Sequence, residues 1–490
     1  MIGVLVFSVF VYHRFTLGID FGIYNQAVFQ ISHGNLNAFS TILGYPIVKS
    51  HFELILWPLS LLVVLFRTSF VLLFVQDICL VGTGLVVFMW VAKLLESRNL
   101  SRRVVIAILA GTTALIIVDP LLYYSAALDF HIEATATFFA AFAAFDIWSG
   151  QNWRAPIWLG LCLLCGDIGG LYVAGVGISS TLASPGTRRM GMLAVAAGIA
   201  WVGLIIALGD NQGSHFASGY GYLAGRPTVV AGVGGGLAVI GGVVTHPARW
   251  LGVLRDRLHL IVTYLLPGGV IGVVTAWGVG VPAVVLLSSS LQATPLFISN
   301  PFQRFAVFPF VLFGTVLLLT WLISDDPPAL LSSDRWSRHR IGRQALSLVA
   351  AACAGLGALL FAGQRLPVTL KVTPIGGFIP GDEASVLRQV LARTPSSAEV
   401  IVSLPVSGRF SSRKYVCLYL TAGAPIPVHR GIVLLVMDTA HSGPFVSQAH
   451  QQQAADYAVA KFHARTIVHA ANIWALEWSA ATPISSVALP

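Results

Sequence analysis

Residues 70–103 read FVLLFVQDICLVGTGLVVFMWVAKLLESRNLSRR, and this stretch decides the fold. Residues 70–92 are almost wholly apolar, and about 20 such residues allow a helix to cross a bilayer. Residues 93–103 carry Lys93 and three arginines against one acid, Glu96. Because short loops rich in Lys and Arg stay in the cytoplasm, the stretch predicts a membrane-spanning helix whose C-terminal end faces the cytoplasm.

The composition extends this prediction to the whole chain. Of its 490 residues, 56% are hydrophobic and 10% are charged, whereas about a quarter of the residues of a soluble domain are charged. The mean hydropathy is +0.80. Apolar runs of helical length recur, and helices satisfy their own backbone groups in lipid. The sequence therefore predicts an all-α polytopic membrane bundle of about 11 spans with further interfacial or re-entrant helices.

The net charge of +9 does not indicate a nucleic-acid partner. The basic residues lie mostly in short loops between apolar runs, where they set the orientation of the spans. The five cysteines are scattered and indicate no disulfide framework.

The chain before residue 70 is predicted to hold an outer loop. An apolar run at 2–17 precedes a polar stretch, 18–52, in which residues 20–32 have the apolar spacing of a helix lying along the membrane surface. Residues 53–66 are short for a span and contain Pro58, so they are predicted to be interfacial or re-entrant. One crossing, 70–92, then separates the outer loop from the cytoplasmic loop 93–103.

Loop charges set the remaining crossings in the same way. They are predicted at 104–122, 132–148, 191–209, 228–244, 260–276, 305–323 and 345–361. The apolar stretch between Arg154 and Ser184 is predicted to form two short helices that turn at Asp167, and 279–290 is not expected to cross.

From about residue 365 the sequence has the polarity of a soluble domain. An amphipathic helix is predicted near 382–393, and strands are predicted at 400–404, 415–420, 432–438 and 466–478. The chain is thus divided into a transmembrane domain, 1–363, and an extracytoplasmic α/β domain, 364–490.

Ionisable residues at the edges of spans are costly and are often retained for function. The candidates of this kind are Asp20, His51, Glu53, Asp77, Asp119, Asp129, His131, Glu133 and Asp167. On the predicted topology all of them except Asp77 lie at outer helix ends or in outer loops. Structural roles remain open for several. Asp20 would suit a helix cap, the segment 129–133 a helix start, and Asp167 a turn. No histidine has the i, i+4 partner of a zinc helix, so the metal ligands stay unknown.

Several motifs resemble one family of bacterial multi-pass membrane proteins, known as domain of unknown function 2079. They are DFGIYNQA (20–27), HGN (33–35), HF (51–52), WPL (57–59), FHIE (130–133), VSLPVS (402–407) and VMD (436–438). The resemblance extends through Leu223 and the Val281–Pro282 region. The chain departs from the family pattern at Ile132, at 165–167 and at 302–304.

That family is similar in layout to the glycosyltransferase C superfamily. The resemblance implies an inverting transferase of the bacterial cytoplasmic membrane that moves a sugar from a polyprenyl-phosphate donor to a cell-envelope acceptor on the outer face. Its partners would be the lipid-linked donor and membrane lipids. A divalent metal ion is left open as a cofactor.

The resemblance also implies roles for individual residues. Asp20 would be the general base, and Arg304 would bind the lipid phosphate. His51 and Glu53 would orient the acceptor or a metal. His131 and Glu133 would line the opposite wall of the site, and Asp167 would be a further substrate-binding residue.

Two other functions remain open from the sequence. A transporter or flippase of a lipid-linked precursor would need carboxylates near the middle of the bilayer and inverted repeats. A catalytically inactive membrane scaffold would use its outer domain to bind a partner. The sugar, the acceptor and the oligomeric state are not defined by the sequence.

Overall fold

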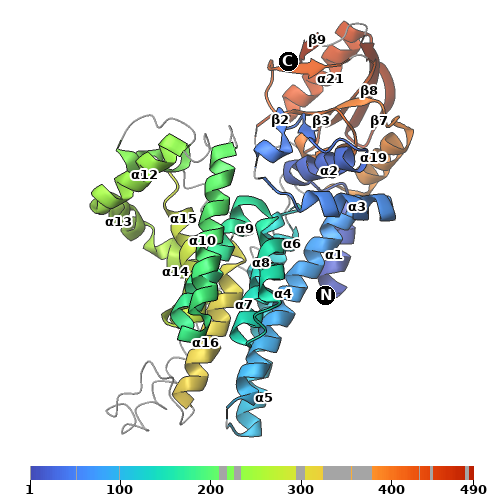
Figure 1. Cartoon of the computed structure of the whole chain (residues 1–490). Coiled ribbons are helices and arrows are strands. Elements are labelled where there is room, and N and C mark those ends of the chain that lie inside the picture. Colours follow the sequence, from blue (N-terminus) through green and yellow to red (C-terminus); the bar gives the residue numbers. More distant parts are fainter. Residues whose placement is uncertain are drawn as a thin grey trace.

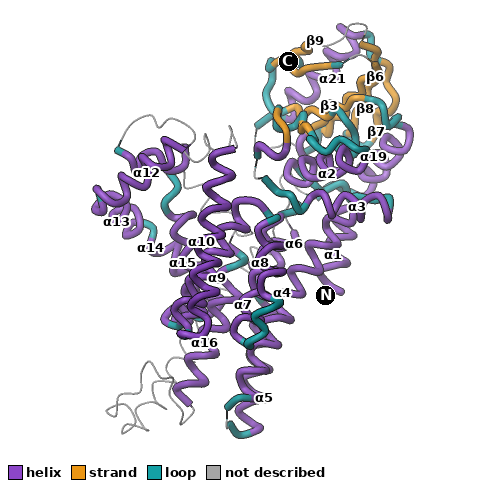
Figure 2. Tube along the Cα trace, viewed as in Figure 1, coloured by secondary structure: helices purple, strands orange, loops and turns teal. Residues whose placement is uncertain are grey.

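A computed structural model of the chain describes residues 2–50, 52–98, 100–127, 129–208, 218–225, 233–293, 304–323, 355, 378–429, 431–441, 445–480 and 485–490. Figure 1 shows a long bundle of helices that carries a small sheet region at one end, and Figure 2 separates the two by secondary structure. The bundle consists of α1 (Ile2–His13), α4 (Phe70–Glu96), α5 (Arg102–Val118), α6 (Pro120–Ala127), α7 (Ile132–Trp148), α8 (Ala155–Leu163), α9 (Gly166–Ala183), α10 (Pro185–Leu208), α15 (Ala276–Ser290) and α16 (Val307–Ile323).

Aromatic side chains fill the middle of the bundle. Trp90 of α4 is fully buried, and its ring stacks on Phe313 of α16 with 3.7 Å between ring centroids. Trp277 of α15 packs on the same indole at 5.6 Å. Three helices that are distant in the sequence therefore share one core.

Helices α9 and α10 approach each other through glycines. A Cβ atom added at Gly198 would lie 2.5 Å from the carbonyl oxygen of Gly170, and one added at Gly191 would lie 2.6 Å from that of Gly177. Gly170 and Gly177 are seven residues apart on α9, and Gly191 and Gly198 are seven residues apart on α10, so each pair lines one face of its helix. Small residues that let two backbones approach in this way are typical of helix pairs in membranes.

Three helical segments are long and apolar enough to cross a membrane: α4, α5 continued to Tyr123, and α10. A fourth would be the pair α12 (Val233–Thr245) and α13 (Pro247–Asp256), which is bent by 85°. The described residues thus give three or four spans by this measure, and the count of about 11 stays a prediction. The expected span at 345–361 lies outside the described residues.

Two expected crossings are not single straight helices. Residues 260–276 are divided among α14 (Leu258–Leu265) and the 3-10 helices η3 (Leu266–Gly268) and η4 (Val270–Val274). Pro267 removes a backbone donor there, and Gly269 adopts φ +79°, which ends the helix. The expected crossing at 228–244 forms α12, after which the chain bends sharply at Pro247. By contrast, the expected break near Asp167 is confirmed, because α8 ends at Leu163 and α9 begins at Gly166.

The predicted interfacial segments are both helical. They form α2 (Ile19–Ser32) and α3 (Leu56–Phe66). Figure 1 shows them lying across the end of the bundle, beneath the sheet region, while the α4–α5 connection lies at the opposite end. The loop 18–52 and the basic loop 93–103 therefore lie at opposite ends of the bundle, as the sequence predicts.

The sheet region contains a five-stranded mixed sheet in the order β4-β3-β6-β8-β7. Strand β3 is parallel to β4 and β6, while β8 is antiparallel to β6 and β7. Its strands are β3 (Glu399–Ser403), β4 (Val416–Tyr419), β6 (Gly431–Asp438), β7 (Arg465–Ala470) and β8 (Ile473–Ala480). The single strand expected at 466–478 is in fact the hairpin β7–β8, because Ala471 and Asn472 take φ of 47° and 62° and form a tight turn.

Helices cover both faces of the sheet. Alternate strand residues pack on α19 (Gly381–Arg393) on one face and on α21 (Gln448–Phe462) on the other. The helix expected near 382–393 is thus confirmed. The minor pairs β1 (Phe39–Ser40) with β2 (Tyr45–Pro46), and β5 (Pro425–Val428) with β9 (Ser485–Ala488), were not expected. The predicted boundary at 363/364 lies outside the described residues.

The loop 18–52 joins the sheet region to the bundle. Asn25 of α2 donates to the carbonyl of Gly408 at 3.0 Å, and Gln26 donates to that of Lys414 at 3.0 Å. Thr41 both donates to the carbonyl of Val416 and accepts from its N–H, at 2.5 and 2.9 Å. These bonds attach the loop to the edge strand β4 and to the segment before it, so the sheet region is fixed directly above α2.

Candidate functional site

A carboxylate from the segment between α6 and α7 holds the start of α2. Gly18 stands at the cap position and brings no side chain. Asp129, which follows α6, accepts hydrogen bonds from the N–H of Gly18 at 2.7 Å and from the N–H of Asp20 at 3.2 Å. A carboxylate at a helix start satisfies free backbone donors and the positive end of the helix dipole. Asp129, rather than Asp20, therefore supplies the acceptor for these two amides.

Tyr24 is the centre of a group of acidic side chains one turn further along α2. Its hydroxyl donates to Oε1 of the buried Glu53 at 2.7 Å, and its ring packs edge-on against Phe130 at 5.1 Å. Burial raises the pKa of Tyr24, and the nearby carboxylates of Glu53, Glu133 and Asp20 raise it further. Three of the predicted site residues, from α2, the segment before α3 and α7, thus lie within electrostatic reach of one phenol.

Gln76 fixes the turn that leads into α7. Its amide nitrogen donates to the carbonyls of Ser125 and Asp129, both at 3.1 Å, and its amide oxygen accepts from the N–H of His131 at 2.6 Å. His131 is buried at the cap position of α7, and Glu133 lies in the first turn. One amide inside span α4 therefore positions the start of α7, which carries His131 and Glu133 of the FHIE motif.

Arg304 lies deeper in the bundle, just before α16. Its side chain has no exposed surface, and its guanidinium stands over the ring of Tyr264 at 4.9 Å. Tyr172 of α9 lies within electrostatic reach of both Arg304 and Glu133. The predicted phosphate-binding cation thus shares one neighbour, Tyr172, with the acidic group around Tyr24.

The other predicted residues are less closely tied to this group. Asp167 lies in the first turn of α9, where its carboxylate accepts from the N–H of Ile168 at 2.9 Å, and it is near Tyr220. His51 lies outside the described residues. Asp77, inside α4, accepts from Ser8 of α1 at 3.0 Å, which ties two helices together. The structure thus places Asp20, Glu53 and Glu133 together, with His131 at the start of the same helix as Glu133.

Some partners of these residues could be recognised from the sequence, and others could not. Gln76 and Asp129 were visible as polar residues at or near a span. Tyr24 belongs to the motif DFGIYNQA, but aromatic residues there also suit an interfacial helix, so the sequence did not single out Tyr24. Among the described residues at this end of the bundle, no three histidine or carboxylate groups lie close enough to hold one ion. A metal requirement therefore stays a prediction.

Fold and site together define a polytopic membrane protein with an acidic site beneath an attached sheet region. The chain belongs to the family described as "Predicted membrane protein (DUF2079)", whose sequence profile matches residues 12–424. The sequence-based family assignment is thereby confirmed.

The fold can also be set beside solved structures. A crystal structure of ArnT from Cupriavidus metallidurans bound to undecaprenyl phosphate aligns over 98% of this chain and 97% of that one, with 12% sequence identity and a TM-score of 0.43. The apo form of the same protein aligns over 97% of each chain, with 12% identity and a TM-score of 0.42. No curated protein matches the chain.

Proposed function

We propose that the chain is a membrane glycosyltransferase that moves a sugar from a polyprenyl-phosphate donor to a cell-envelope acceptor on the outer face. The observation that carries the proposal is the group of Asp20, Glu53 and Glu133 around Tyr24, at the end of the bundle that bears the sheet region. The basic loop at the opposite end of the bundle predicts that this end faces outward, and the resemblance to the glycosyltransferase C layout implies a catalytic role for the loop carboxylate.

The reaction is an inverting displacement. The acceptor hydroxyl attacks the anomeric carbon, a new glycosidic C–O bond forms, and the bond from that carbon to the phosphate oxygen breaks. The acceptor proton passes to a general base, and the polyprenyl phosphate leaves with the electron pair. Asp20 is the proposed base, because its carboxylate is half-buried and the backbone that carries it is held by Asp129.

Glu53 and Glu133 are assigned to the acceptor. Carboxylates accept hydrogen bonds from sugar or lipid hydroxyls, and a second charge near Asp20 makes it a stronger base. Tyr24 holds Glu53 in place through its hydroxyl bond of 2.7 Å. In this scheme His131 and Asp167 line the approach to the site, and His51 orients the acceptor.

Arg304 is assigned to the departing lipid phosphate. Guanidinium groups bind phosphate oxygens through paired, charge-assisted hydrogen bonds. Because Arg304 has no exposed surface here, phosphate binding requires the side chains that cover it to move. The tyrosines beside it, Tyr264 and Tyr172, are the first candidates for that movement.

An assay in membranes tests the proposal. Membranes that contain the wild-type chain or D20N are supplied with labelled polyprenyl-phosphate sugars, and the label transferred to envelope acceptors is counted. Loss of a general base costs about 10²- to 10⁴-fold in rate, so D20N is expected to transfer at least about 100-fold more slowly.

The matched control is D146N. Asp146 also belongs to α7, but it accepts from the indole of Trp158 at 3.0 Å, away from the α2 end. D146N is expected to retain the transfer rate. Full activity in D20N would refute the assignment of the base, and absence of transfer by the wild type from every donor supplied would support the inactive scaffold instead.

A further inference from the structure

A second cluster of ionisable side chains lies in the sheet region, apart from the acidic group around Tyr24. It consists of Glu383 in the first turn of α19, Asp438 at the end of β6, and His441 three residues later. One ligand atom from each lies within 4.8 Å of the other two. Both carboxylates are buried, while the imidazole is 20% exposed. No single motif contains the three residues, because Glu383 lies more than 50 positions before Asp438, although Asp438 itself ends the VMD motif.

In each carboxylate, one oxygen accepts hydrogen bonds from neighbouring N–H or amide groups, and the other oxygen lies nearest to Nδ1 of His441. Oδ1 of Asp438 accepts from the N–H groups of Ala440 and His441, at 3.0 and 3.1 Å. Oε1 of Glu383 accepts from the amide nitrogen of Asn472 at 2.9 Å. The second oxygens, Oδ2 of Asp438 and Oε2 of Glu383, lie 3.0 and 3.3 Å from Nδ1 of His441. The polar groups around the cluster therefore orient both carboxylates toward one point.

The protein by itself does not satisfy this arrangement. Oε2 of Glu383 is buried and has no hydrogen-bond partner among the described residues. One imidazole nitrogen carries at most one proton, yet three carboxylate oxygens lie within 3.3 Å of Nδ1. Two buried carboxylates also bring two negative charges against one imidazolium at most. Burial of charge without full compensation is unfavourable, and it raises the pKa of both carboxyl groups.

We propose that Glu383, Asp438 and His441 bind a divalent transition-metal cation such as Zn²⁺. The cation would take Nδ1 of His441, Oδ2 of Asp438 and Oε2 of Glu383 as ligands, with water at a further position. Zinc binds nitrogen and oxygen at about 2.0–2.2 Å, so neighbouring ligand atoms of a tetrahedral site are about 3.3–3.6 Å apart. The present separations of 3.0 and 3.3 Å need only a small expansion. An imidazole ligand favours a transition metal over Mg²⁺ or Ca²⁺.

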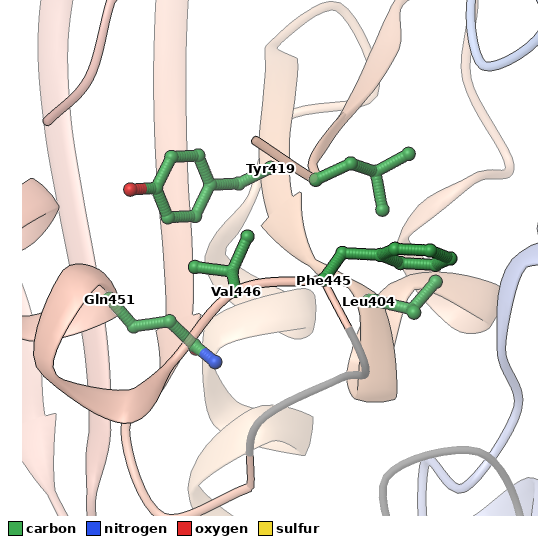
Figure 3. A pocket seen from close by; sticks show the side chains of 6 residues that line it. Leu404, Tyr419, Phe445, Val446 and Gln451 are labelled. Carbon is green, nitrogen blue, oxygen red and sulfur yellow. The ribbon is translucent and has the colours of Figure 1, made fainter. Parts of the chain in front are cut away.

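The position in the fold suits a ligand site. Asp438 ends β6, which lies parallel to β3, and β3 is parallel to β4. Ligands of α/β folds bind beyond the carboxyl ends of such strands. The same edge carries a small pocket lined by Leu404, Tyr419, Leu420, Phe445, Val446 and Gln451, most of which Figure 3 labels. Gln451 joins pocket and cluster, because its amide nitrogen donates to the carbonyl of His441 at 3.1 Å.

Metal binding to the full-length chain in detergent tests the proposal. Protein stripped with a chelator is titrated with Zn²⁺ by calorimetry, and bound metal is counted by elemental analysis. One Zn²⁺ per chain is expected. H441A is expected to bind at least about 100-fold more weakly, since loss of an outer-shell partner alone costs about 10- to 100-fold. N472A, which removes such a partner from Glu383, is expected to fall in that smaller range.

His429 offers the matched control. Its Nδ1 lies 3.1 Å from Oε1 of Glu399, so it also pairs with a buried carboxylate but faces only one. H429A is expected to bind Zn²⁺ as the wild type does. Equal losses in H429A and H441A would overturn the proposal, as would a wild-type chain that binds no Zn²⁺.

A measurement on the wild type alone guards against misfolded variants. Co²⁺ bound to nitrogen and oxygen ligands at low coordination number gives visible absorption bands, which Zn²⁺ should abolish at one equivalent. Absence of such bands from Co²⁺-loaded wild-type protein would also overturn the proposal. None of these readouts depends on sugar transfer, so the site is tested separately from the proposed function.

Discussion

Asp129 should hold α2, and with it Asp20, in place on the bundle. Its carboxylate accepts from two backbone N–H groups, at 2.7 and 3.2 Å. A hydrogen bond to a charged group contributes about 1.5–3 kcal/mol. Because Asp129 is half-buried, the low end of that range applies to each bond. D129A should therefore lower the free energy of opening the start of α2 by about 3 kcal/mol.

Hydrogen exchange measures this change directly. Amides that exchange through local opening speed up tenfold for each 1.4 kcal/mol of lost stability. The amides of residues 18–24 in D129A should exchange roughly a hundredfold faster than in the wild type, in full-length protein in detergent. D129N keeps one acceptor oxygen, so its exchange rate should lie between the two. The proposed sugar transfer should fall with the loss of order at Asp20.

The control separates this local effect from general destabilisation. D146A removes another carboxylate acceptor, which serves Trp158, and it should leave exchange at 18–24 unchanged. Exchange in D129A within about threefold of the wild type would refute the capping role. So would equal acceleration in D146A, because the effect would then not be specific to α2.

Three further changes have outcomes that follow from the contacts. Y24F removes the donor to the buried Glu53 and should cost about 1–3 kcal/mol in stability; a thermal midpoint like that of Y123F, which alters an exposed tyrosine, would contradict it. G198A places a methyl group 2.5 Å from the Gly170 carbonyl, whereas G203A on the same helix meets nothing within 4 Å. G198A should therefore lose about 1–3 kcal/mol of stability in detergent while G203A loses none, and equal midpoints would disprove the close α9–α10 contact. R413A removes a buried guanidinium that donates to the carbonyls of Phe410 and Ala398, at 2.6 and 3.1 Å. It should lower the unfolding free energy of the sheet region by about 3 kcal/mol, and urea unfolding no different from that of exposed R393A would count against it.

Much of the helical architecture could be predicted from the sequence. The span α4, the helix α2, the break between α8 and α9 and the strands β3, β4 and β6 all lie where local patterns place them. These features depend on hydropathy and on turn residues within a few positions of each other. The misplaced elements have local causes too, namely Pro267 with Gly269 in the expected span at 260–276, and the turn at Ala471–Asn472.

The candidate site was only partly predictable. The sequence identified Asp20, Glu53 and Glu133 as polar residues at helix ends, but not the phenol of Tyr24 that lies among them. It left open whether Asp20 caps α2, because the cap comes from Asp129, 111 residues away from Gly18. Such a bond has no local signature, since it depends on how α2 meets the α6–α7 turn.

What the sequence by itself determined is therefore the class of protein, its membrane helices and the acidic end of its bundle. Hydropathy, loop charge and turn chemistry depend on residues that are close together in the sequence, so they can be determined from the sequence directly. The tertiary structure alone decided which of these side chains meet: the cap on α2, the link from Glu133 through Tyr172 toward Arg304, and the cluster of Glu383, Asp438 and His441. Each involves segments that are distant in the sequence, and only the packing of helices and the pairing of strands brings them close together.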